Sequence, residues 1–194
     1  MLLPRFEFKH CLYIGVILLI IIDLWSKAWA FDKVGLFMPA QPIFGEWLSV
    51  YCITNAGGIW GIGGGGGFTN ILTIIRMIAV TFLILYIHKQ HPQNKVGLCT
   101  LGLLLAGALG NLYDNLSTVM PWSGNGEVRD FIMFKVASPT AALENVWIFD
   151  PFPIFNFADA CISVGFVLLL TGVARLGDSF KPPQQYNIAC FLQR

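Results

Sequence analysis

Four long apolar stretches constrain this chain more than any other feature of its sequence. They cover residues 11–30, 69–88, 96–115 and 156–175. An α-helix of about 20 residues measures about 30 Å, which is the hydrocarbon thickness of a bilayer. The composition agrees, because 56% of the 194 residues are hydrophobic and only 12% are charged, about half the charged share of a soluble domain. We therefore predict an all-α membrane protein with four transmembrane helices.

The positive charges predict how these helices are oriented. Lysine and arginine gather before the first stretch, in the loop 88–95 and after the fourth stretch, at Arg5, Lys9, Lys89, Lys95, Arg175, Lys181 and Arg194. Short loops rich in positive charge stay in the cytoplasm. Both termini and the loop 88–95 are therefore predicted to be cytoplasmic.

The two longer segments, 31–68 and 116–155, are then predicted to lie on the extracytoplasmic side. The first contains "EWLSVYCIT", whose β-branched and aromatic residues favour short strands. We expect a small extracytoplasmic β-sheet over the outer membrane face. Residues 1–175 are predicted to form one domain, and the cytoplasmic tail 176–194, which contains "PPQQYN", is predicted to be disordered.

Polar residues inside the stretches are predicted to gather in the outer half of the bilayer. With the predicted orientation, this group comprises Asp23, Lys27, Arg76, Asn111, Asp114, Asn156 and Asp159. Charged groups in a membrane are costly and usually face the interior of a helix bundle or a functional path. Because they come from all four stretches, we predict a site in the outer leaflet.

Structural explanations are available for most of this group. Asp23 and Lys27 are four residues apart and can neutralise each other on one helix face. Arg76 can extend toward the outer headgroups, and the asparagines can form hydrogen bonds between helices. Asp159 has no opposite charge within four residues. Asp130 lies in "EVRDFIMF", where the chain becomes apolar again, so we expect it to return to the membrane surface beside the fourth stretch.

Two neighbouring carboxylates at a membrane surface suit peptide hydrolysis. One retains a proton and donates it to a carbonyl oxygen, while the other, ionised, activates water. The sequence contains no GxSxG, HExxH or phosphate-loop motif. An ion or proton pathway fits the same cluster equally well, and composition does not separate the two. The net charge of +1 gives no sign of a nucleic-acid partner, and no Cys/His spacing indicates a metal site.

Five short blocks in order resemble bacterial lipoprotein signal peptidase, also called signal peptidase II. The blocks are "DLWSK" (23–27), "TNAGGIWG" (54–61), "GALGNLYD" (107–114), "VRDF" (128–131) and "FNFADACISVG" (155–165). The resemblance implies a four-span aspartyl endopeptidase of the bacterial cytoplasmic (inner) membrane. Its substrate would be a prolipoprotein, cut before a diacylglyceryl cysteine. Membrane lipid around it, inhibition by globomycin, no metal or cofactor, and a monomeric state are further expectations.

The resemblance also implies roles for single residues. Asp130 and Asp159 correspond to the catalytic dyad of the family. Positions that contact the substrate or line the site correspond to Asn55, Gly57, Asn111 and Asn156. Supporting positions correspond to Asp23, Lys27 and Asp114.

The chain departs from the family pattern at three places. The third block usually continues as "DR", and here Asn115 follows the aspartate, so Arg76 and Arg129 are candidates to supply the missing charge. The second block has altered neighbours in "NAGGIWG" followed by a glycine run, and the segment 131–155 is longer than usual. A member that binds lipidated peptides without cleaving them is therefore a second hypothesis.

Overall fold

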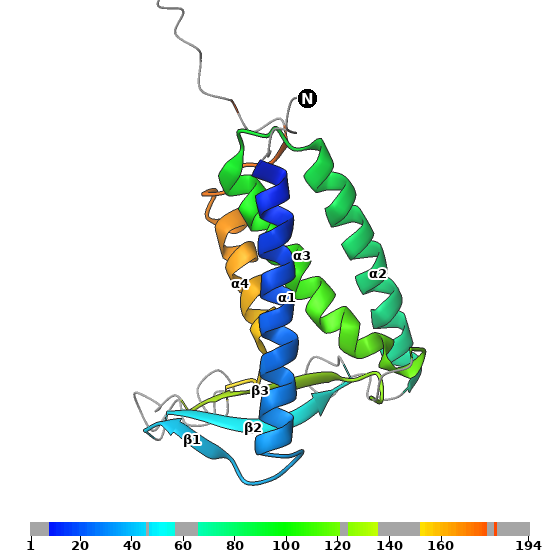
Figure 1. The fold of residues 1–194 in the computed structure, drawn as a ribbon, viewed down its shortest axis with the longest axis vertical. Helices are drawn as coiled ribbons and strands as arrows, with labels where there is room; N and C mark the ends of the chain where they lie inside the picture. The colour runs from blue at the N-terminus through cyan, green and yellow to red at the C-terminus, as the bar shows by residue number, and fades with distance from the viewer. Residues whose placement is uncertain are drawn as a thin grey trace, which may run out of the picture.

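A computed structural model describes residues 8–45, 47–56, 66–120, 124–135, 152–177 and 181. Four helices form a bundle, and a small sheet crosses one end of it (Figure 1). In chain order the elements are α1 (Phe8–Lys33), β1 (Gln41–Phe44), β2 (Leu48–Asn55), α2 (Gly66–Lys89), α3 (Lys95–Asn115), the 3-10 helix η2 (Leu116–Thr118), β3 (Val128–Phe134) and α4 (Phe157–Leu170). The start of α1 and the α2–α3 connection lie at the end opposite the sheet.

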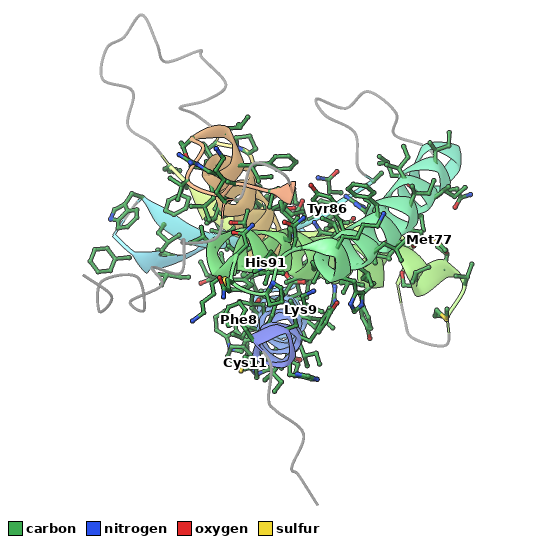
Figure 2. The ribbon with its side chains drawn as sticks, turned by 90° about the horizontal axis from the view of Figure 1, so that it is seen from above. Phe8, Lys9, Cys11, Met77, Tyr86 and His91 are labelled. Carbon is green, nitrogen blue, oxygen red and sulfur yellow. The ribbon has the colours of Figure 1, made fainter. Side chains whose placement is uncertain are left out.

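Helix α3 is the centre of the bundle and packs against each of the other three helices. Seen along the bundle in Figure 2, α1 and α2 flank it, and the labelled Met77 of α2 lies on the outside. The buried apolar core runs along α3 through Leu98, Leu101 and Leu105. By contrast, α1 and α2 expose isoleucine, leucine and phenylalanine over most of their length. Such apolar outer faces are those of a protein whose solvent is lipid.

Three of the four predicted spans are confirmed as helices of sufficient length and apolarity, and the fourth is shorter than predicted. Helices α1, α2 and α3 each contain a window that qualifies as a membrane span. Helix α4 is equally apolar but has only 14 residues, from Phe157 to Leu170. That length gives about 21 Å of helix, less than the hydrocarbon thickness. The helix stops because Thr171 caps it and Gly172 adopts a φ of +71°.

Small residues allow α3 to approach its neighbours closely, and the Ala106-x-x-x-Gly110 spacing in its sequence is typical of such an approach. A methyl group on Gly110 would lie 2.5 Å from Asp23 Oδ2 on α1 and 3.1 Å from Ala158 Cβ on α4. Gly107, rather than Ala106, provides the second contact, since a methyl group there would lie 2.4 Å from the Ala158 carbonyl oxygen. These two glycines set the distance at which the polar residues of α1, α3 and α4 meet.

Gly110→Ala is expected to destabilise the protein, because the added methyl group forces α1 or α4 away from α3. Overpacking of this kind costs about 1–3 kcal/mol in the free energy of unfolding. Thermal denaturation in detergent measures it. Gly15→Ala is the matched control, because nothing lies within 4 Å of a methyl group at that position of α1. Equal melting temperatures for the two variants would contradict the close approach.

The predicted strands form a three-stranded antiparallel sheet in the order β1-β2-β3. Strands β1 and β2 come from the first outer segment, and β3 comes from the segment that contains Asp130. Residues 128–134 therefore form a strand, and not only an apolar return toward the membrane. A second small core, formed by Ala30, Val50, Cys52 and Phe131, joins the sheet to the end of α1.

Several predictions fall outside the described residues. They concern Gly57, most of the glycine run, the greater part of the long segment 131–155 and the proposed disorder of the tail 176–194.

Candidate active site

Asp159 lies in the first turn of α4, where it forms a capping box with Asn156. The Asn156 Oδ1 atom accepts a hydrogen bond of 2.9 Å from the Asp159 backbone N–H. In return, Asp159 Oδ2 accepts one of 3.2 Å from the Asn156 backbone N–H. This reciprocal pattern satisfies two N–H groups that a helix N-terminus leaves unpaired. The "NFAD" sequence thus fixes the Asp159 carboxylate at the helix N-terminus, which favours negative charge.

Backbone pairing between β3 and the chain before α4 brings Asp130 to the same place. The Phe155 carbonyl oxygen accepts hydrogen bonds from the N–H groups of Phe131 and Ile132, and the Phe155 N–H donates to Ile132. Asp130 and Asn156 adjoin these paired residues. Their side chains meet, and Asn156 Nδ2 donates to Asp130 Oδ1 at 2.6 Å. One asparagine therefore contacts both aspartates.

Two further asparagines complete the contacts to the aspartates. Asn55 of β2 donates from Nδ2 to Asp130 Oδ2 at 3.1 Å. It reaches Asp130 diagonally across the β2–β3 pair, because Asn55 is aligned with Val128 and Ile53 with Asp130. Asn111 of α3 donates from Nδ2 to Asp159 Oδ1 at 2.8 Å and accepts from Asn156 Nδ2 at 3.1 Å. The four side-chain oxygens of the aspartates are thus all hydrogen-bonded.

A second charged cluster supports the first from the α1 side. Lys27 Nζ lies 2.8 Å from Asp23 Oδ2 and 3.1 Å from Asp114 Oδ2. It also donates to Asn111 Oδ1 at 3.1 Å. Because the Asn111 oxygen faces the ammonium group, its NH₂ group must face Asp159. Lys27 is completely buried, so its charge is stabilised by these partners and by the Gly110 carbonyl oxygen, to which Nζ donates at 3.5 Å.

Asp23 and Asp114 each join Lys27 to another element. Asp23 Oδ1 accepts a hydrogen bond of 2.9 Å from the Ala158 backbone N–H in the first turn of α4. Asp114 Oδ1 accepts from Arg129 Nε at 2.9 Å and from Arg129 Nη2 at 2.7 Å. The Arg129 backbone N–H also donates to Asp114 Oδ2 at 3.1 Å. These bonds fix α4 and β3, the two elements that carry Asp159 and Asp130, against α1 and α3.

The two aspartates lie in different environments. Asp130 is 1% exposed, whereas Asp159 is partly exposed. Burial and then the neighbouring charge of Asp159 raise the pKa of Asp130 to about 7, although hydrogen bonds from Asn55 and Asn156 oppose the rise. Asp130 therefore holds a proton at a pH where an ordinary carboxyl group is ionised. This is the asymmetry that separates an acid from a base in a carboxylate pair.

An apolar cavity lies beside the residues that follow Asp130 in β3. It measures about 380 Å³ and is lined along β3 by Phe131, Ile132 and Phe134, with Trp29 and Phe155 around them. Asp130 immediately precedes these β3 residues in the strand. Among the described residues, no group of three or more His, Cys, Asp or Glu side chains is arranged to hold a metal ion.

The structure brings together every predicted site residue that it describes. Asp130, Asp159, Asn55, Asn111 and Asn156 form one hydrogen-bonded network, and Asp23, Lys27 and Asp114 form the cluster beside it. The Asp23–Lys27 pairing that the four-residue spacing suggested is present. Arg76 does not extend away from the bundle, since its Nη1 atom donates to Asn115 Oδ1. The catalytic and substrate-binding roles of these residues stay predictions.

Sequence reasoning missed the pairing of Arg129 with Asp114. The sequence assigns Asp114 a supporting position but does not identify Arg129 as its partner, because Arg129 lies 15 residues later, beyond a turn. The available signal was strand alternation. If Asp130 points toward α4, its neighbour Arg129 must point to the other face of β3.

The raised pKa of Asp130 predicts that stability falls as pH rises. The folded protein keeps this proton to about pH 7, whereas an unfolded chain releases it near ~3.9. The contribution is therefore complete below ~3.9 and is lost as the pH rises to about 7, with a slope of at most about 1.4 kcal/mol per pH unit. The melting temperature of Asp130→Asn, measured from pH 4.5 to 8, should depend less on pH. Asp32→Asn, on an exposed carboxylate, should behave as the wild type does. Parallel curves for all three proteins would contradict the assignment.

Comparison with known proteins gives a consistent result. Residues 15–175 match the family model for signal peptidase (SPase) II. The lipoprotein signal peptidase of Clostridium acetobutylicum is 29% identical over 77% of this chain and 84% of its own length. That of Deinococcus radiodurans is 32% identical over 80% of this chain and 74% of its own. A bacterial membrane enzyme determined by the in meso method at 2.3 Å superimposes with a TM-score of 0.61 and 27% identity, covering 86% of this chain and 89% of the other. This chain belongs to the signal peptidase II family.

Proposed function

We propose that this protein is a membrane-embedded aspartic endopeptidase that removes signal peptides from diacylglyceryl-modified prolipoproteins, cutting before the lipidated cysteine. The observation that carries the proposal is the Asn156 side chain, which contacts both Asp130 and Asp159 in a chain of the signal peptidase II family. A carboxylate pair bridged in this way can share one proton. Family membership indicates the class of substrate, and the carboxylate pair indicates that the reaction is peptide hydrolysis by acid–base catalysis.

The different burial of the two aspartates supports an assignment of roles. Asp159 is partly exposed and acts as the base that takes a proton from the attacking water. Asp130 is buried, with its pKa raised to about 7, and donates its proton to the carbonyl oxygen of the scissile bond. When the tetrahedral intermediate collapses, the C–N bond breaks and the leaving amine takes the proton from Asp159. One hydroxyl group of the intermediate returns its proton to Asp130 as the new carboxyl group forms. No covalent bond to the protein forms at any step.

The position of the pair suits a substrate that lies in the membrane. Asp159 is at the N-terminus of an apolar helix and Asp130 precedes an apolar strand. The cavity of about 380 Å³ along β3 has an almost wholly apolar lining. An acyl chain of the lipidated cysteine is a ligand of matching chemistry for such a cavity.

The proposed topology has four membrane crossings with both termini in the cytoplasm of a bacterium. Helix α4 alone is too short, but the chain continues to the far end of the bundle. There Asn94 Nδ2 donates to the Arg175 carbonyl oxygen at 2.7 Å, and Gly177 N–H donates to Gln90 Oε1 at 3.0 Å. Residues 157–175 together therefore reach the level of the α2–α3 loop. The proposed location is therefore the inner membrane, with the aspartate pair toward the outside, and we propose that a monomer of residues 1–175 forms the site.

Cleavage of a matched substrate pair tests the function. Purified protein in detergent is given a diacylglyceryl prolipoprotein, or the same prolipoprotein without the lipid, and products are separated on a gel. We expect cleavage of the lipidated form alone, and its inhibition by globomycin. Equal cleavage of both forms would refute the substrate assignment. Absence of cleavage together with binding of globomycin would support a member that binds lipidated peptides without cutting them.

A further inference from the structure

The charges at the site form two groups, and only one of them is neutralised by direct contacts. Lys27 contacts Asp23 and Asp114, and Arg129 contacts Asp114. Two cations thus face two carboxylates, so this group is neutral. The net effect of Lys27 and Arg129 on other groups is therefore small, although the Lys27 charge still has a minor effect on Asp130.

The catalytic pair has no such contacts within the described residues. Asp130 accepts hydrogen bonds from the amides of Asn55 and Asn156. Asp159 accepts from the Asn111 amide and from the Asn156 backbone. All these donors are uncharged. If the pair holds one proton, one negative charge is left in a largely apolar surrounding, and a counter-charge would stabilise it.

Among the residues that the structure describes, Arg76 is the remaining cation near this site. Its Nη1 atom donates to Asn115 Oδ1. Asn115 is 2% exposed, and its Nδ2 atom donates to the Gly126 carbonyl oxygen at 2.7 Å. This second bond settles the orientation of the amide, because the NH₂ group faces Gly126 and the oxygen faces Arg76. Asn115 therefore holds the guanidinium group in place.

Helix α3 links Arg76 to the aspartate pair through two of its asparagines. Asn111, which contacts Asp159, and Asn115, which contacts Arg76, are four residues apart and lie on one face of the helix. Asp159, Asp130 and Asp114 all lie close enough for their charges to act on Arg76. Arg76 forms no ion pair within 4 Å in the described part of the chain. It therefore acts on the pair through space.

We propose that Arg76, held by Asn115, is the counter-charge that stabilises the state in which Asp130 and Asp159 share one proton. This rests on the proposed function only for its consequence in catalysis, since the electrostatic effect exists whether or not a peptide is cut. Arg76 is a positioning residue, because it acts through the aspartates and contacts neither of them. The charges of Asp23, Lys27, Asp114 and Arg129 largely cancel one another, although Lys27 has a minor effect on Asp130. Among the described residues, Arg76 is the cation near the pair whose charge no ion pair offsets.

The test compares Arg76→Gln, Arg76→Lys and wild type by infrared titration of the protonated carboxyl band, assigned with Asp130→Asn. Removing a nearby cation disfavours ionisation, so the apparent pKa values of the pair should rise by about one unit in Arg76→Gln. Arg76→Lys should titrate close to wild type. Arg175→Gln removes an equal charge at an exposed position at the far end of the bundle and should change nothing. Asn115→Ala, which releases Arg76 without removing it, should give a smaller rise.

The pH dependence of cleavage gives the second readout. In Arg76→Gln the whole profile should move to higher pH, so that cleavage on the acid side falls about tenfold for a one-unit shift while the rate above neutral is retained. A rate lowered equally at every pH would indicate a merely structural role and overturn the proposal. An infrared titration unchanged from wild type in Arg76→Gln would overturn it too. If the titration shifts but wild type cuts no prolipoprotein, the proposed function is refuted, while the proposed role of Arg76 as counter-charge is supported.

Discussion

Asp159→Asn is expected to lower the rate of prolipoprotein cleavage by about 10³-fold or more while the protein stays folded. The base that activates water is lost, and positioned acid–base groups contribute about 10²–10⁴-fold each. The fold persists because an asparagine oxygen can still accept the 3.2 Å hydrogen bond from the Asn156 backbone and so keep the cap of α4. The cleavage rate and the melting temperature are measured on the same preparation.

Asp130→Asn is expected to give a similar loss, because an amide cannot donate the acid proton to the substrate. The losses should not add in the double variant, since the two residues act as one unit. Asp32→Asn is the matched control, because it neutralises a carboxylate whose side chain is 72% exposed at the end of α1. Normal turnover in either Asp159→Asn or Asp130→Asn would contradict the assignment of the pair.

The helical part of the fold was predictable because each apolar stretch is read independently of the others. The end of α4 was not, because the predicted span continued to Arg175 while the chain leaves the helix after Leu170. That departure depends on the local backbone at Gly172 and on hydrogen bonds from the α2–α3 loop to Arg175. Hydropathy contains neither signal.

The candidate site was predictable to the level of its residues, but not of its contacts. Asp130 and Asp159 could be selected because carboxylates are rare in apolar surroundings and because short blocks resemble one family. The bridging position of Asn156 depends on the backbone pairing of Phe155 with Ile132, which joins segments more than 20 residues apart. The contacts of Arg129 with Asp114 and of Arg76 with Asn115 also join separate elements, 15 and 39 residues apart. Pairings across such separations are fixed by the tertiary fold, and no local pattern marks them.

Lys27→Met is expected to cause the largest loss of stability among the variants considered. Lys27 is completely buried, and its ammonium group lies 2.8 Å from Asp23 and 3.1 Å from Asp114. Methionine fills a similar volume. It leaves Asp23 as a buried carboxylate without a cation, whereas Asp114 keeps its ion pair with Arg129. Removing one partner of a buried ion pair costs about 3–5 kcal/mol. The melting temperature in detergent should fall by roughly 10 °C.

Two variants separate the effect of charge from the effect of packing at Lys27. Lys33→Met removes a lysine from the same helix, but its side chain is 64% exposed beside Asp32, so its melting temperature should equal that of wild type. Lys27→Met combined with Asp23→Asn should regain part of the loss, because the stranded carboxylate is then neutral and its oxygen can still accept from the Ala158 N–H. If the double variant is no more stable than Lys27→Met, the loss arises from packing. In that case packing, and not the charge cluster, would hold the first turn of α4 against α1. Asp159 lies in that turn.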